Sequence, residues 1–188
     1  MRTNEDFFGT DQNKEMLIWG TGLIAPRKTP VLNVEHNVRA KIVRGKPSEH
    51  SDVTSDRSNV DRAKKVAYFM MDHPSRLVQS HMGTLLVRSK EQEMTYGSKQ
   101  STGPNGLQFM VAKGEVYLQE TDVKKLEDGM KYSTCQRADF ISEDDKVILS
   151  GFPSVYQETD TLTGEIITIY RTKNLVEVSH ANGIHETK

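Results

Sequence analysis

The sequence lacks most of the features that identify a particular chemistry. It has one cysteine, Cys135, so no internal disulfide can form, and we interpret this thiol as a small buried hydrophobe. Aromatic residues make up only 7% of the chain, and no apolar run is long enough to span a membrane as a helix. The net charge is −1, with basic and acidic residues mixed along the chain. Charge therefore gives no argument for binding nucleic acid or an anionic membrane.

No segment has the pattern of a signal peptide either. The apolar run at residues 16–19 is too short for the apolar region of such a peptide, and no basic segment precedes it. The chain is therefore expected to be either cytoplasmic or a mature or truncated form of an exported protein.

Candidate catalytic and metal sites are weak. Gly20, Gly22 and Ala25 match the spacing of a dinucleotide-binding loop, but Pro26 forbids the helix that such a loop requires. The six histidines do not have the spacing of a zinc site, and the acidic residues 143–145 are expected to form a solvated turn. We therefore predict no catalytic residue, no metal and no cofactor, and a protein that is not an enzyme.

From residue 60 onward, short apolar and β-branched segments alternate with turn signals at spacings near ten residues. This pattern predicts an all-β sandwich, roll or barrel, in which only residues 121–129 could form a helical turn. Residues 1–30 are polar and contain glycine and proline, so they are predicted to be a flexible arm. Residues 45–59 are predicted to be a mobile loop, residues 181–188 a flexible tail, and residues 31–180 the β domain. Before the loop, two short strands are expected at 31–34 and 38–43, with residues 35–37 turning between them.

Two stretches about eighty residues apart repeat the same order of elements. Each has a strand, a tight Pro-Ser corner, a short strand ending in glutamine, a turn and a further strand. The first occupies residues 65–87 and the second residues 146–169. Such internal similarity is typical of stacked architectures, in which no single unit can bury its apolar face alone.

The second stretch, extended in both directions, carries a resemblance to a known family. Its segments are Ala138-Asp139-Phe140, Lys146-Val147-Ile148-Leu149-Ser150-Gly151, Pro153-Ser154-Val155-Tyr156-Gln157 and Asp160-Thr161-Leu162-Thr163-Gly164-Glu165-Ile166. This order resembles the repeat of the LptA/OstA-like family of periplasmic lipopolysaccharide-transport proteins. Residues 112–119 and 59–87 look like further, partial copies.

The resemblance implies an open β-jelly-roll, or twisted β-roll, of repeated short antiparallel strands. It also implies a periplasmic carrier that shields lipopolysaccharide acyl chains in an apolar groove and helps to bridge the inner and outer membranes. Partners would be lipopolysaccharide, other transport proteins with similar rolls, and further copies of the chain joined head to tail. A β-roll scaffold that binds protein and carries no lipid is the alternative, and low aromatic content favours a lining that leaves a gap.

Alternation along the strands selects the candidate lipid-binding residues. The predicted lining consists of Leu85, Val87, Val147, Leu149, Val155, Ile167 and Ile169. The opposite face remains an alternative, because Ile148 and Ile166 are apolar too. A plain structural core is a further alternative for the same positions.

The last predicted strand alternates cleanly and contains no proline, which leaves its edge lightly protected against pairing with another chain. The predicted oligomer edge consists of Leu175, Val176, Glu177 and Val178. Its expected partner in a second copy is the strand at 31–34 or the strand at 38–43.

Overall fold

The computed structural model describes residues 2–11, 14–26, 28–44, 46–97, 107–121, 132–157, 160–173 and 175–180. These residues form sixteen strands and no helix, so the described part of the chain has no helix that could cross a membrane. The strands are β1 (Arg2–Thr10), β2 (Met16–Ile24), β3 (Val31–Arg44), β4 (Lys46–Ser55), β5 (Arg57–Asp61), β6 (Val66–Met70), β7 (Val78–Met82), β8 (Leu85–Ser89), β9 (Glu91–Tyr96), β10 (Leu107–Glu120), β11 (Tyr132–Ile141), β12 (Lys146–Ser150), β13 (Ser154–Gln157), β14 (Asp160–Thr163), β15 (Ile166–Tyr170) and β16 (Leu175–Ser179). The all-β prediction is confirmed.

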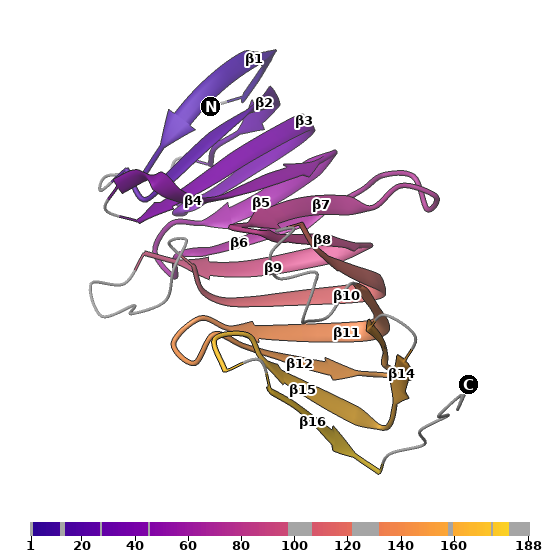
Figure 1. The fold of residues 1–188 in the computed structure, drawn as a ribbon. Helices are drawn as coiled ribbons and strands as arrows, with labels where there is room; N and C mark the ends of the chain where they lie inside the picture. The colour runs from indigo at the N-terminus through magenta and orange to yellow at the C-terminus, as the bar shows by residue number, and fades with distance from the viewer. Residues whose placement is uncertain are drawn as a thin grey trace.

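Long strands shared by two walls organise this sheet. The first half of β3 pairs with β5 and its second half with β4, while β10 pairs with β9 and then with β8. In the same way β11 pairs with β13 through its first half and with β12 through its second. We call the wall of β5, β6, β9, β12, β15 and β16 wall A, and the wall of β4, β7, β8, β13 and β14 wall B. The strands stack from β1 at one end to β16 at the other, as Figure 1 shows.

The chain crosses between the walls on one side of the roll, which we call the corner side. The bend of β10 falls at Gly114 and Glu115, with φ of 74° and 51° and a register shift in the pairing with β11. The connection from β12 to β13 turns at Gly151, with φ of 73°. Positive φ is accessible to glycine at little cost, and a bulge bends its strand, so the chain changes walls at these positions and the pairing resumes on either side.

The opposite side carries the turns that join strands within one wall, and we call it the turn side. It includes the turns at 62–65 and 142–145 in wall A and at 83–84 in wall B. No strand pairing among the described residues joins the walls there. Among the residues that the structure describes, backbone hydrogen bonds therefore join the walls on the corner side only.

A single apolar core fills the space between the walls. Inward positions alternate with outward ones along each strand, and the buried residues of both walls belong to one continuous cluster. Fully buried members include Phe69 and Leu149 of wall A and Val78 and Leu85 of wall B.

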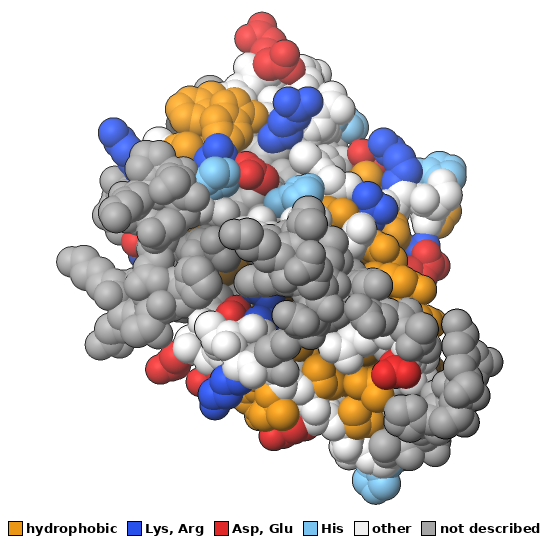
Figure 2. All heavy atoms as spheres, in the orientation of Figure 1, with side chains coloured by type: hydrophobic (Ala, Val, Ile, Leu, Met, Phe, Trp, Pro, Cys, Tyr) orange, Lys and Arg blue, Asp and Glu red, His pale blue; other side chains and the backbone are white. Residues whose placement is uncertain are grey.

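The outer face is mixed. Figure 2 shows charged side chains of both signs among apolar ones, with an apolar cluster near the N-terminal end. Phe8 and Trp19 are exposed there with ring centroids 5.1 Å apart. Farther along, Tyr132 stacks between Tyr117 and Tyr156, at 6.0 and 4.3 Å. The stacked rings cover part of each other's faces, and such aromatic pairs are common on the outer surface of a sheet.

Three predictions about the N-terminal part were wrong. Residues 1–30 do not form a flexible arm, because β1 and β2 pair along their lengths and β2 pairs with β3. Residues 46–55 and 57–61 are strands β4 and β5, where a mobile loop was predicted. The turn predicted at 35–37 is a bulge inside one continuous strand, with Asn37 at φ of 54°. In each case backbone pairing overrides polar composition, since only one face of an outer strand has to be apolar.

Two further predictions fall on residues outside the described ones. These are the flexible tail at 181–188 and the helical turn expected at 121–129, of which only Thr121 is described.

Candidate functional site

The predicted lining residues all lie in the interior of the roll. Leu85, Val87, Leu149, Val155 and Ile167 are 0% exposed, Val147 is 3% exposed and Ile169 is 5% exposed. On the opposite face Ile166 is 43% exposed and Ile148 is partly exposed. The structure therefore places the selected face, and not its alternative, between the walls.

These residues come from both walls. Val147 pairs with Ile169, and Leu149 with Ile167, on β12 and β15 of wall A. Leu85, Val87 and Val155 belong to wall B, where Leu85 and Val87 pair with the end of β10. A ligand that reached one set would therefore lie against the other as well.

The interior also holds polar groups that the sequence analysis did not single out. The Tyr96 hydroxyl, the Gln92 Oε1 atom and the Ser58 and Ser133 hydroxyls are buried without a hydrogen-bond partner among the described residues. The Gln92 amide nitrogen donates to the carbonyls of Val78 and Val87, at 3.3 and 3.4 Å. An unpartnered buried polar atom lowers stability, so these atoms are available to a polar group that enters the interior.

Two buried groups that can lose a proton, the Tyr96 hydroxyl and the Cys135 thiol, have raised pKa values. Burial raises the pKa of Tyr96 to about 12, with a further contribution from the negative charges of Asp11 and Glu15. Burial also raises the pKa of the Cys135 thiol to about 12, and this thiol is 5% exposed. A thiol held in its neutral form is a poor nucleophile, which agrees with its interpretation as a small buried hydrophobe.

We expect the free energy of unfolding to fall as the pH rises from about 9 toward 11. Both groups keep their protons in the folded state at pH values where the unfolded chain loses them, so their contribution is complete below the unfolded pKa and is lost above it. Cys135 contributes a slope of up to about 1.4 kcal/mol per pH unit above pH 9, and Tyr96 adds the same slope only above pH 10, because the unfolded pKa values are 9.0 and 10.0. Urea denaturation at several pH values would measure the slope. A Cys135→Ala variant should show a shallower slope between pH 9 and 10, and an unchanged slope would contradict the assignment.

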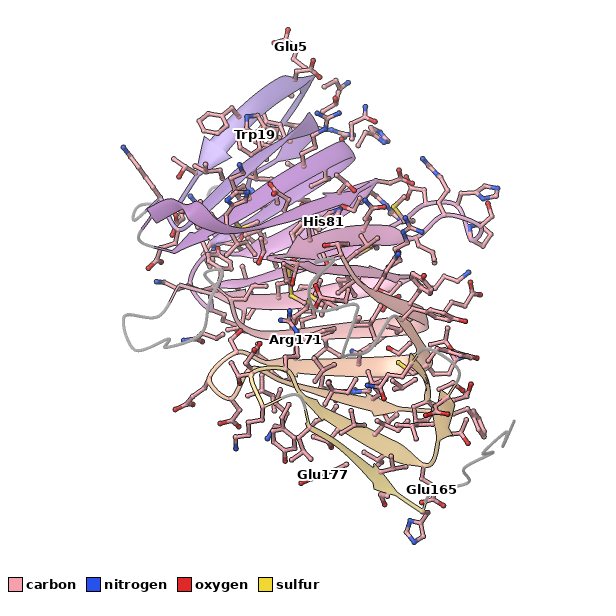
Figure 3. The ribbon with its side chains drawn as sticks, viewed as in Figure 1. Glu5, Trp19, His81, Glu165, Arg171 and Glu177 are labelled. Atoms are coloured by element: carbon pink, nitrogen blue, oxygen red, sulfur yellow. The ribbon has the colours of Figure 1, made fainter. Side chains whose placement is uncertain are left out.

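An ion-pair cluster joins the two walls on the turn side, on the C-terminal half of the stack. Arg171, in the turn after β15, donates through Nη1 to Asp145 at 3.2 Å, and its backbone N–H donates to the Asp145 carbonyl. Its Nη2 atom lies 3.5 Å from a carboxylate oxygen of Glu120 and 3.4 Å from the Thr84 hydroxyl. Asp145 belongs to wall A, whereas Glu120 and Thr84 belong to wall B. Figure 3 labels Arg171 near the middle of the stack, at the level of β10 and β11.

A second ion pair joins the walls near the N-terminal end of the same side. Lys65, in the turn between β5 and β6 of wall A, lies 2.6 Å from a carboxylate oxygen of Glu15. Glu15 precedes β2 at the wall B end of that strand, and its carbonyl accepts from Val43 at 2.8 Å. The Lys65 ammonium also donates to the Gly97 carbonyl of wall A.

Two hollows lie beside these ion pairs. A small one of about 30 Å³ is bounded by Arg171 and Asp145 together with Met82, Leu107 and Phe140, which come from both walls. A wider, open one of about 640 Å³ lies beside Lys65 at the N-terminal end. It is lined by Thr10, Asp11, Lys14, Pro30, Arg62, Ala63 and Lys65.

The acidic turn and the glycine-rich segment have structural roles. Asp144 pairs with Lys146 at 3.2 Å, and Asp145 holds Arg171. Residues 20–24, which match the dinucleotide-binding spacing, lie in β2 and begin no helix. Within the described residues, no group of three or more histidine, cysteine or acidic side chains could hold a metal ion.

The two ends of the stack are edge strands. Among the described residues β16 pairs only with β15, so the edge formed by Leu175, Val176, Glu177 and Val178 is unpaired on its outer side. At the other end the outermost strand is β1. The expected N-terminal partner was therefore wrong, because residues 31–34 and 38–43 lie within β3, which β2 and β1 cover.

Comparison with known proteins gives a similar fold and no sequence relative. No protein-family model matches the chain, and no curated protein matches it significantly. A solved structure with a similar fold is LptH from Pseudomonas aeruginosa, described as the LptA homologous periplasmic component of the lipopolysaccharide transport device. The TM-score is 0.61 at 13% identity, and the match covers 77% of this chain and 100% of the LptH chain. The predicted LptA-like β-roll is thus confirmed as a fold.

Proposed function

We propose that this chain is a lipid carrier of the lipopolysaccharide-transport type, and not an enzyme. It shields acyl chains between its two walls in the periplasm and hands them along a bridge between the inner and outer membranes. The observation that carries the proposal is the continuous apolar interior, lined from both walls, in a fold shared with LptH. The lining residues are the seven selected from the sequence, from Leu85 to Ile169.

The energetics suit a carrier. Burying acyl chains gains about 0.8 kcal/mol per CH₂ group, so a chain of about twelve carbons gains about 10 kcal/mol. Apolar walls supply this without any catalytic group. The proposed partners are lipopolysaccharide, other transport proteins with similar rolls and further copies of this chain.

Lipid extraction tests the proposal. The protein would be purified from a lipopolysaccharide-producing host and its bound lipid identified by mass spectrometry. Binding of a fluorescent acyl probe to delipidated protein, and its displacement by lipopolysaccharide, would be measured alongside. We expect lipopolysaccharide to co-purify and to displace the probe. A folded protein that carries no lipid and binds no probe would contradict the proposal.

One observation favours a second candidate, a β-roll scaffold that binds protein through its edges. Five of the seven lining residues are 0% exposed, so side chains of the roll itself fill the space around them. A scaffold needs an interior filled by its own side chains. In a carrier, lipid has to displace those side chains from one another. Failure of both lipid measurements, together with binding of a protein partner at an edge strand, would support the scaffold.

A further inference from the structure

A carrier with this interior has to open before it can load, and this inference rests on the proposed function. In the structure Leu149, Val155 and Ile167 are inaccessible, so acyl chains reach them only when the walls separate. The polar head of an amphiphile stays in water, because burying it without partners is costly. Backbone connections between the walls block the corner side. The head group therefore has to protrude on the turn side.

The turn side is where the two cross-wall ion pairs lie. We call Arg171 with Glu120, Thr84 and Asp145 the C-terminal clasp, and Lys65 with Glu15 the N-terminal clasp. In the first, Arg171 is anchored to its own wall by Asp145 and reaches Glu120 on the other wall. In the second, Lys65 is anchored by the Gly97 carbonyl and reaches Glu15. Each clasp thus has one ion pair across the opening and an anchor within wall A, and the Thr84 hydroxyl adds a second contact across the opening in the C-terminal clasp.

We propose that the clasps are reversible closures of the roll, and that the C-terminal clasp opens to admit acyl chains sideways through the turn side. The side chains of Arg171 and Glu120 are 14% and 7% exposed, so the closed clasp excludes most water from the pair. When the walls separate, both charges regain their hydration. That gain offsets much of the lost attraction. An ion pair at this position therefore opens more readily than an apolar seam of the same size.

The C-terminal clasp also limits the movement of a bound amphiphile along the roll. An amphiphile that moves along the roll with its head outside would have to pass Arg171 and Glu120. The side chains must separate for each passage. The rate of opening then sets the rate at which cargo enters and moves.

A matched pair of substitutions isolates the link across the opening. Glu120→Gln removes the cross-wall charge and leaves Arg171 paired with Asp145, so no buried charge is left alone. Asp145→Asn makes the same chemical change within wall A and leaves the cross-wall pair in place. Asn also tolerates the φ of 44° at this position.

The single thiol of the chain reports opening without any lipid. Cys135 is 5% exposed and belongs to the core at the bend of β11, where the two walls meet, so a thiol reagent reaches it from the turn side only when the walls separate. We expect Glu120→Gln to raise the labelling rate about fivefold, which corresponds to about 1 kcal/mol, and to raise the loading rate of an acyl probe similarly. Asp145→Asn should change both rates less than twofold.

Global unfolding also exposes Cys135, so its rate would be measured separately for each variant. Labelling of Glu120→Gln at the wild-type rate, or labelling that only follows global unfolding, would overturn the clasp proposal. Faster labelling without faster probe loading would overturn it too. A protein that never binds the probe would instead refute the carrier function, while the labelling rates would still show whether the clasp controls opening.

Discussion

Replacing Ile167 by Asp is expected to unfold the C-terminal half of the roll. Ile167 is 0% exposed and its cross-strand partner Leu149 is 0% exposed too. The change deletes a buried side chain, at about 2–5 kcal/mol, and places a carboxylate among apolar groups, at several kcal/mol more. The sum approaches the whole stability of a typical domain, about 5–15 kcal/mol. Circular dichroism and urea denaturation would measure the loss.

The neighbouring residue gives a matched control. Ile166 lies on the same strand, faces outward and is 43% exposed. Ile166→Asp introduces the same carboxylate into water, and we expect it to change stability by less than about 1 kcal/mol. Equal effects at the two positions would contradict the assignment of the interior face. A folded Ile167→Asp protein that has lost only probe binding would show an interior far more open than the structure indicates.

The interior face could be predicted because alternation repeats over several strands. The sequence left the opposite face open as an alternative, since Ile148 and Ile166 are as apolar as their neighbours. In the structure Ile148 pairs with Asp139 and Thr168 on the outer face, which keeps it partly exposed. The identity of neighbouring strands therefore decides which face is buried, and a single strand does not contain that information.

Strands β1, β2 and β4 were missed for a related reason. Their sequences contain glycine, serine or charged residues, and local propensity treats such residues as loop formers. They are strands because a partner strand accepts their backbone hydrogen bonds. Their outward faces need no apolar side chains. Pairing between distant segments overrides composition here.

The clasps are not visible in the sequence at all. Arg171 and Glu120 lie far apart in the chain, and neither belongs to a motif with a characteristic spacing. The two walls bring them together only after the strands have stacked in register. By contrast, the sequence predicted the turn at residues 143–145 but not the ion pair that one of its acidic residues makes. Asp145 is held by Arg171 and is not merely solvated.

Deleting residues after Lys173 is expected to convert a concentration-dependent oligomer into a monomer. The unpaired outer side of β16 carries few charges, and the edge of β1 at the other end is also available. Pairing between these different edges is heterologous, so it produces open chains of copies without one dominant size. The bulge in β1 between Thr3 and Asp6 leaves residues 6–10 as its regular, pairing part.

A proline substitution tests the same edge while keeping the strand. The Ser179 carbonyl accepts from the Glu165 N–H at 3.1 Å, so Leu175, Glu177 and Ser179 direct their backbone groups toward β15. Val176 and Val178 then direct theirs to the open edge, because successive residues alternate. Val176→Pro removes an outward N–H and should abolish association without breaking the pairing with β15.

Sedimentation velocity over a hundredfold range of concentration measures both variants against the intact chain. The intact chain should show a distribution that shifts to larger species with concentration, whereas the two variants should sediment as monomers. Val176→Pro is the more direct test of the open edge, because truncation exposes β15 as a new edge and Val176→Pro does not. An intact chain that sediments as an unchanging monomer would contradict bridging by self-association. It would leave lipid binding between the walls unaffected, since that property requires only one copy.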